Sequence, residues 1–142
     1  MPPARFGVGM SLEDVHEIQR LKHEYCFAID GGDYERWASL YSEDGRFVRD
    51  SGETFEGHEE IHAFASEGFD AAMDHSAHVV TNPVVDVEGD TATGRWYLLL
   101  FYRDADGNEG WRQATYEDEY RRVDGEWRIA ESSIDYGLDR RF

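Results

Sequence analysis

The second half of the chain, after Asp74, reads as a series of long strands joined by short turns. Apolar and polar residues alternate along it, and turn sequences rich in Gly and Asp interrupt the alternation. Strands that follow one another through such turns pair antiparallel, so this half predicts a meandering sheet. The expected strands are Val79–Glu88, Thr91–Arg103, Trp111–Val123 and Trp127–Tyr136.

The first half carries helical patterns instead. Apolar residues recur at steps of three and four from Leu12 to Ile29, which predicts an amphipathic helix. Ser11 is its expected N-cap, Asp14 is the acid of a capping box, and Gly31-Gly32 ends the helix. A short second helix is expected after Asp33 and a third helix after Gly57. A hairpin is expected between them, at Arg46–Phe55.

The order of these elements predicts an α+β fold, with three N-terminal helices on one face of a curved, mostly antiparallel sheet. No repeat or Pro/Gly-rich linker divides the 142 residues, so we expect one domain over 1–142 with a core at about 12–136. A sheet curved around helices leaves a cavity between the layers. The strands hold enough aromatic residues to line it: Trp96, Tyr97, Phe101, Tyr102, Trp111, Tyr116, Tyr120, Trp127 and Tyr136.

The net charge of −17 restricts the possible partners, because so acidic a surface repels nucleic acids and anionic membranes. Of the 14 basic residues only Lys22 is a lysine. Acid-rich, lysine-poor surfaces are typical of proteins from salt-loving organisms, in which salt screens the self-repulsion. The alternative is an ordinary acidic protein with a solvated carboxylate surface.

Cysteine content and hydropathy bear on the compartment. Cys26 is the single cysteine, so an internal disulfide framework and a multi-cysteine zinc site are excluded. Its place among apolar residues of the first helix predicts a small buried side chain. No apolar run is long enough to span a membrane, and Met1–Met10 lacks the apolar stretch of a signal peptide. We therefore expect a cytoplasmic protein.

Two segments resemble metal-binding motifs but depart from them at positions that such motifs require. His58-Glu59-Glu60-Ile61-His62 has the His-Glu-x-x-His form of zinc hydrolases, but no third ligand follows at a suitable spacing. Both histidines also lie off the apolar stripe, so we expect them to face solvent and expect no metal site. Asp104–Gly110 begins like a calcium loop but departs from that pattern later, and a strand-to-strand turn is the better interpretation.

The segment Asp74–Asn82 opens the strand region and is more informative. Alternation places His78, Val80 and Asn82 on one face of the strand. A histidine in this setting is compatible with a structural role, as a core side chain bonded to a backbone carbonyl. Asp30 likewise is compatible with a plain helix-end residue, and Tyr25 with a core residue.

Three strings together resemble a known family: Glu17–Asp33, His75–Asn82 and Thr115–Trp127. They are similar to the SnoaL-like branch of the NTF2-like superfamily, and the resemblance extends from about Leu12 to Tyr136. It implies a cone-shaped α+β barrel with a deep pocket. Relatives include scytalone dehydratase, bile-acid 7α-dehydratase and hexachlorocyclohexane dehydrochlorinase, which are cofactor-free lyases.

The resemblance also implies roles for particular residues. Those enzymes pair an Asp at the end of the first helix with a His on the first long strand, and Asp30 and His78 match these positions. Tyr25 matches a tyrosine of the bile-acid enzyme, although residues five apart on a helix point about 140° from each other. The dehydrochlorinase has a basic pocket residue on its last strand, where this chain has Ala130, Glu131 and Ser133.

The expected activity is a dehydratase-type elimination without a cofactor, on a small apolar hydroxylated or carbonyl substrate. An imidazole with an unperturbed pKa of about 6.5 can take and return a proton at neutral pH, so His78 is the expected base and Asp30 its orienting partner. Tyr25 would polarise a substrate oxygen or protonate the leaving group. His75, Asn82 and Trp96 are further candidates for contacts with substrate.

Other functions on the same fold stay open. An isomerase or a polyketide-type cyclase would share the pocket and differ in its substrate. A non-catalytic ligand-binding or assembly module would leave the Asp–His pair idle and use an exposed face of the sheet. In either case we expect a homodimer or a homotrimer and a small-molecule ligand.

Overall fold

The computed structural model describes residues 11–142. The expectation that Met1–Met10 carries no signal peptide therefore falls outside the described residues. The helical elements are α1 (Leu12–Asp30), α2 (Tyr34–Ser39), α3 (Gly57–Ala63), the π-helical turn η2 (Phe64–Phe69) and α4 (Asp70–Ala72). The strands are β1 (Tyr41–Val48), β2 (Thr54–Glu56), β3 (Met73–Glu88), β4 (Thr91–Asp104), β5 (Glu109–Val123) and β6 (Glu126–Arg141).

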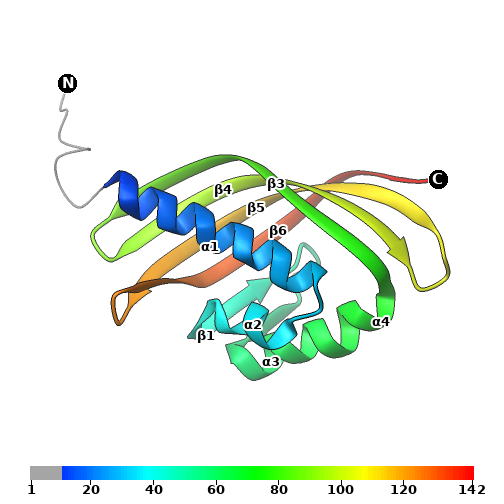
Figure 1. Ribbon diagram of the computed structural model, residues 1–142, viewed down its shortest axis with the longest axis horizontal. Coiled ribbons are helices and arrows are strands. Elements are labelled where there is room, and N and C mark those ends of the chain that lie inside the picture. The colour runs from blue at the N-terminus through cyan, green and yellow to red at the C-terminus, as the bar shows by residue number, and fades with distance from the viewer. Residues whose placement is uncertain (1–10) are drawn as a thin grey trace.

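The six strands form one sheet in the order β2-β1-β6-β5-β4-β3. All neighbouring strands are antiparallel except β1 and β6, which run parallel. Figure 1 shows α1 lying across one face of the long strands, with α2, α3 and α4 gathered beyond its C-terminal end. The expected α+β architecture, with helices on one face of a mostly antiparallel sheet, is confirmed.

Helix α1 begins and ends where its sequence predicts. The Ser11 hydroxyl accepts a hydrogen bond from the Asp14 backbone N–H at 3.1 Å, which satisfies a free donor of the first turn. The Asp14 carboxylate accepts hydrogen bonds from the Trp127 indole N–H and the Arg122 guanidinium, and so ties the start of α1 to the β5–β6 hairpin. Gly32, with φ of 75°, takes the left-handed conformation that ends the helix.

The core lies between α1 and the inner face of the sheet. Seven α1 residues are buried against that face: Ile18, Leu21, Lys22, Tyr25, Cys26, Ala28 and Ile29. On β4 every second residue points inward, and the inward set includes Trp96, Leu98 and Leu100. The cysteine is buried within this core, as its position in the sequence predicts.

A bulge in β3 corrects the expected alternation of that strand. Its pairing with β4 shifts register between Thr81 and Val84, and Asn82 adopts a positive φ of 58°. Ser76 and His78 face inward before the bulge, and Val85 and Val87 do so after it. Because one extra residue moves the following side chains to the opposite face, Asn82 does not share the inner face with His78.

The two metal-like patterns take structural roles. His62 is exposed as expected, but the expectation that His58 faces solvent is wrong. The left-handed Gly57 starts α3 against β1, and the His58 ring Nε2–H donates to the Tyr41 carbonyl at 2.7 Å. The Asp104–Gly110 segment is a turn, in which the Asp104 carboxylate accepts the backbone N–H groups of Asp106 and Asn108.

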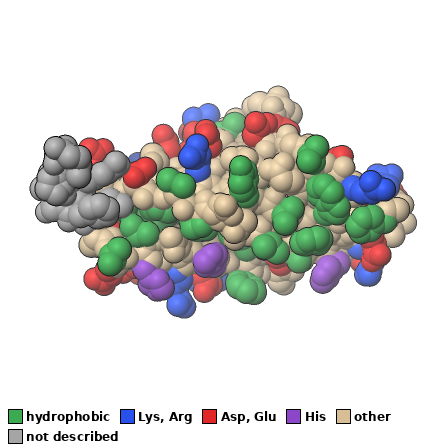
Figure 2. Space-filling view, turned by 90° about the horizontal axis from the view of Figure 1, so that it is seen from above, with side chains coloured by type: hydrophobic (Ala, Val, Ile, Leu, Met, Phe, Trp, Pro, Cys, Tyr) green, Lys and Arg blue, Asp and Glu red, His purple; other side chains and the backbone are tan. Residues whose placement is uncertain are grey.

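The outer face of the sheet is partly apolar. Val79, Tyr97, Leu99 and Phe101 are exposed there, on the adjacent strands β3 and β4. Figure 2 shows one face of the molecule, on which exposed hydrophobic side chains lie among acidic and basic ones. Within residues 11–142, no helix is both long enough and apolar enough to cross a membrane.

Candidate active site

A cavity of about 830 Å³ lies between the C-terminal half of α1, the segment from α3 to α4, and the inner face of the sheet. Its size falls in the range of roughly 300–1,000 Å³ that small-molecule sites occupy. Its aromatic lining residues are Tyr25, Trp37, Phe47, Phe55, Phe64, Phe69, Tyr116 and Tyr136. A pocket with aromatic walls is therefore present, but the expected origin of the rings is largely wrong. Only Tyr116 and Tyr136 of the nine strand aromatics line it, and the other rings come from α1, α2, β1, β2 and η2. The strand aromatics that do not line it are Trp96, Tyr97, Phe101, Tyr102, Trp111, Tyr120 and Trp127.

The π-helical turn η2 shapes one wall. Phe64 and Phe69, five residues apart, both line the cavity, because the wider turn of a π-helix keeps residues at this spacing near one face. The Phe69 ring lies 5.9 Å from the His78 ring, centroid to centroid. This wall thus places an apolar surface beside the imidazole.

Asp30 and His78 form a hydrogen-bonded pair at the edge of this cavity. The His78 ring Nδ1 lies 2.6 Å from one carboxylate oxygen of Asp30, and the His78 backbone N–H donates to the other at 2.7 Å. The Ser76 hydroxyl adds a third hydrogen bond at 2.7 Å. His78 lines the cavity, and its side chain is only 8% exposed. The two residues come from the end of α1 and from β3.

The pKa of Asp30 is lowered. Burial alone would raise it, but the hydrogen bonds from the His78 ring, the His78 backbone and the Ser76 hydroxyl outweigh that effect. Asp30 is therefore a carboxylate at neutral pH. An ionised carboxylate can only accept a hydrogen bond, so the Nδ1 of His78 must carry the ring hydrogen. The Nε2 of His78 then has a lone pair that can accept a proton.

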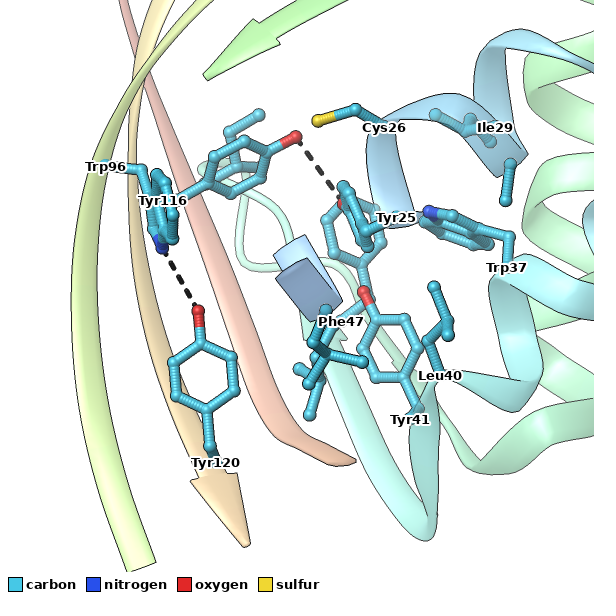
Figure 3. Close-up of a cluster of buried hydrophobic side chains, with 14 of the residues drawn as sticks. Tyr25, Cys26, Ile29, Trp37, Leu40, Tyr41, Phe47, Trp96, Tyr116 and Tyr120 are labelled. Carbon is cyan, nitrogen blue, oxygen red and sulfur yellow. Dashed lines mark hydrogen bonds between the residues drawn. The ribbon is translucent and has the colours of Figure 1, made fainter. Parts of the chain in front are cut away.

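Tyr25 lies deeper in the same cavity wall. Its hydroxyl points toward that of Tyr116 on β5, at 3.4 Å (Figure 3). Burial raises the pKa of both phenols well above the ordinary value, so both keep their protons at neutral pH. Tyr25 and His78 both line the cavity, so the helix end brings the three residues Tyr25, Asp30 and His78 to one site.

Behind the two tyrosines lies a fully buried ion pair. The Lys22 ammonium is 2.9 Å from the Asp118 carboxylate, and both side chains are 0% exposed. The ammonium also lies over the ring faces of Tyr116 and Tyr25, at 3.5 and 4.1 Å from their centroids. Asp118 accepts two further hydrogen bonds, from Ser132 and Tyr120 at 2.7 Å each. The Lys22–Asp118 ion pair thus supports the floor of the cavity, but neither residue lines it.

Three candidate residues lie elsewhere. His75 and Asn82 are exposed, and neither lines the cavity. Trp96 is buried at 1% exposure, and its indole N–H donates to the Tyr120 hydroxyl, away from the cavity (Figure 3). Alternation along β3 already places His75 on the face opposite His78, whereas Asn82 leaves the face of His78 because of the bulge that follows Thr81.

Two residues of the site, Ser76 beside Asp30 and Arg112 in the cavity wall, had no role assigned from the sequence. Ser76, which bonds Asp30, stands two residues before His78 and so shares its face of the strand. Arg112 lines the cavity from β5, and its guanidinium stacks on the Tyr136 ring at 3.8 Å. The sequence did carry a signal for Arg112, because it is a charged residue at the same alternating positions as the inward-facing Ala114 and Tyr116.

The charged rim of the cavity is mixed. Arg49 forms an ion pair with Glu53 at 3.6 Å, and the Glu60 carboxylate accepts the Glu56 backbone N–H at 3.0 Å. Glu67 completes the acidic residues of the lining. Across residues 11–142, no three His, Cys, Asp or Glu side chains are grouped so as to hold a metal ion.

Several solved structures share this architecture. An NTF2-like protein with a cystatin-like fold from Novosphingobium aromaticivorans is 32% identical, with a TM-score of 0.79 over 87% of this chain and 81% of that one. A candidate aromatic ring hydroxylase from the same organism is 30% identical, with a TM-score of 0.85 over 94% and 96% of the two chains. A hexachlorocyclohexane dehydrochlorinase from Novosphingobium barchaimii is 20% identical, with a TM-score of 0.86 over 92% and 91%.

The family assignment agrees with the geometry. The model of the SnoaL-like domain matches residues 10–133, which include α1 and nearly all of the sheet. The match therefore spans both halves of the site, with Asp30 on the helix and His78 on the strand. The chain belongs to the SnoaL-like family and has its NTF2-like α+β fold.

Proposed function

We propose that the protein is a cofactor-free lyase that eliminates water from a small, largely apolar hydroxylated carbonyl compound. The observation that carries the proposal is the Asp30–His78 pair, joined at 2.6 Å, with the imidazole in the wall of an aromatic cavity. An imidazole held by a buried carboxylate is the arrangement that general-base catalysis requires.

In the proposed reaction, the free Nε2 of His78 takes a proton from the carbon beside the carbonyl. The electron pair of that C–H bond forms the enolate and then the C=C bond, as the C–O bond to the β-hydroxyl breaks. The departing oxygen receives a proton from the His78 imidazolium and leaves as water. Asp30 stabilises the imidazolium through the Nδ1–H bond at 2.6 Å.

Tyr25 is the proposed donor to the carbonyl oxygen. Its raised pKa keeps the phenol protonated, and the contact of its hydroxyl with that of Tyr116 is long, at 3.4 Å. A hydrogen bond to the oxygen on which the enolate charge develops lowers the barrier to proton removal.

Water is preferred to halide as the leaving group. The last strand, β6, lines the cavity with Ile134 and Tyr136 and gives it no basic side chain. Glu131 lies in the segment that was compared with the basic pocket residue of the dehydrochlorinase, and it forms an ion pair with Arg46. The similarity to the dehydrochlorinase thus supports an elimination on this fold but does not extend to its leaving group.

A panel of β-hydroxy ketones on aromatic and alicyclic skeletons tests the proposal, with enone formation followed by ultraviolet absorbance. We expect turnover of at least one member, reduced by about 10²–10⁴ in both His78→Ala and Asp30→Asn. Asp135→Asn, an exposed carboxylate on β6, serves as the control. Normal turnover in the His78 and Asp30 variants would remove the pair from the chemistry.

An isomerase would use the same first step and return the proton to another carbon, so product analysis by NMR distinguishes it. A non-catalytic module is favoured by one observation, the apolar outer face of β3 and β4. That alternative predicts ligand binding in the cavity without any conversion of the panel.

A further inference from the structure

Arg112 is a cationic side chain of the cavity without a carboxylate partner. Its guanidinium stacks on Tyr136, and among the described residues no ion pair involves it. Asp139, its cross-strand neighbour on β6, forms none with it either. Most other arginines of this acidic protein do pair with Asp or Glu: Arg20, Arg36, Arg46, Arg49, Arg103, Arg121, Arg122 and Arg128.

Arg112 and His78 lie on one cross-strand row of the sheet. His78 on β3 is paired with Leu100 on β4, and Leu100 is paired with Arg112 on β5. Directly paired residues point to the same face, and all three line the cavity. Two strand spacings separate the outer two, so their backbones are about 10 Å apart. The base and the guanidinium thus face one cavity from fixed, adjacent strands.

The opposite rim disfavours a negative charge. The cavity residues of β2, α3 and η2 and the turn before them include Glu53, Glu60 and Glu67. The second cavity arginine, Arg49, is already paired with Glu53. An anionic group would therefore be attracted to the Arg112 side and repelled from the helical side, so the charges of the wall give a bound ligand one orientation.

We propose that Arg112 binds a carboxylate of the substrate, and that the substrate class is flat, apolar ring compounds carrying one carboxylate. The aromatic lining takes the ring body, and the planar guanidinium takes the carboxylate through two parallel hydrogen bonds. The cross-strand row from His78 through Leu100 to Arg112 separates the bound carboxylate from the carbon that faces His78 by about the length of one ring system. Naming this ligand a substrate rests on the proposed function, whereas the binding site itself does not.

Binding of a matched probe pair tests this inference without requiring turnover. The probes are 4-biphenylcarboxylate and 4-biphenylcarboxamide, which share their shape and differ in charge, and isothermal titration calorimetry gives both affinities. We expect the wild-type protein to bind the carboxylate at least about tenfold more tightly. Arg112→Gln should remove that preference while leaving the affinity for the amide within about twofold of wild type.

Arg95→Gln is the matched control, because Arg95 is exposed on the neighbouring strand β4 and does not line the cavity. It should keep the preference for the carboxylate. Equal affinities in the wild type, a preference that survives in Arg112→Gln, or no binding of either probe would each overturn the inference. A preference that depends on Arg112 in a protein inactive on every hydroxy ketone would sustain the site and reject only the proposed reaction.

Discussion

Asp30 holds His78 at two places, because one carboxylate oxygen accepts the ring Nδ1–H at 2.6 Å and the other accepts the backbone N–H at 2.7 Å. The backbone contact fixes the carboxylate to strand β3, and the ring contact then fixes the imidazole to the same carboxylate. A pair held in this way is oriented before any ligand enters, which is what acid–base catalysis gains from preorganisation.

The stability of the fold should depend on pH through Asp30. A carboxyl group whose pKa is lower in the folded protein than its unfolded value of about 3.9 stabilises the fold above that value. This contribution is lost as the pH falls through the lowered pKa. We therefore expect Asp30→Asn to destabilise the protein at neutral pH and to differ less from wild type in acid. Urea unfolding from neutral to acidic pH measures this, and a difference that grows in acid would contradict it.

Lys22→Met should be strongly destabilising. It leaves the Asp118 carboxylate buried without its counter-charge, a change that typically costs about 3–5 kcal/mol of unfolding free energy. Arg20→Met, two residues earlier on α1, removes an exposed pair with Glu24 and should cost no more than about 1 kcal/mol. Chemical denaturation compares the two variants. Similar costs for both would mean that the buried pair contributes no more than a surface one.

Local signals predicted α1 well, since its cap, its apolar stripe and its terminal glycines all lie within the helix or next to it. The Asp30–His78 pair joins residues 48 positions apart, and only the resemblance to a family connected them. The bulge at Asn82 was not predictable, because pairing with β4 decides where the register shifts. Lys22 did carry a signal, as a charged residue within the apolar stripe of α1, but its partner Asp118 lies on a distant strand.

The acidic surface predicts a salt-dependent stability. With a net charge of −17, carboxylates repel one another over distances that salt screens, since the Debye length falls from about 10 Å at 0.1 M to about 3 Å at 1 M. We expect the melting temperature to rise over this range of KCl concentration, as the salt-loving interpretation requires. A melting temperature that is flat or falls across the series would reject that interpretation.

The apolar outer face predicts self-association as a dimer or trimer. Exposed apolar residues on adjacent strands form the kind of surface that a partner subunit covers, and Leu99 and Phe101 lie within it. Sedimentation velocity should show an oligomer for the wild type and a monomer for the double variant Leu99→Glu, Phe101→Glu. Leu138→Glu, exposed on β6 outside this patch, is the control. A wild-type monomer at all concentrations would refute the prediction.

The most direct test of the central claim asks whether His78 removes a proton from carbon. NMR in D₂O follows deuterium exchange at the acidic carbon of 2-tetralone, a flat ketone that needs no leaving group. We predict exchange faster than the buffer reaction, slowed by about 10²–10⁴ in His78→Ala. It should be unchanged in His75→Ala, whose imidazole is exposed on the same strand. Exchange no faster than buffer in the wild type, or equal in wild type and His78→Ala, would contradict the account.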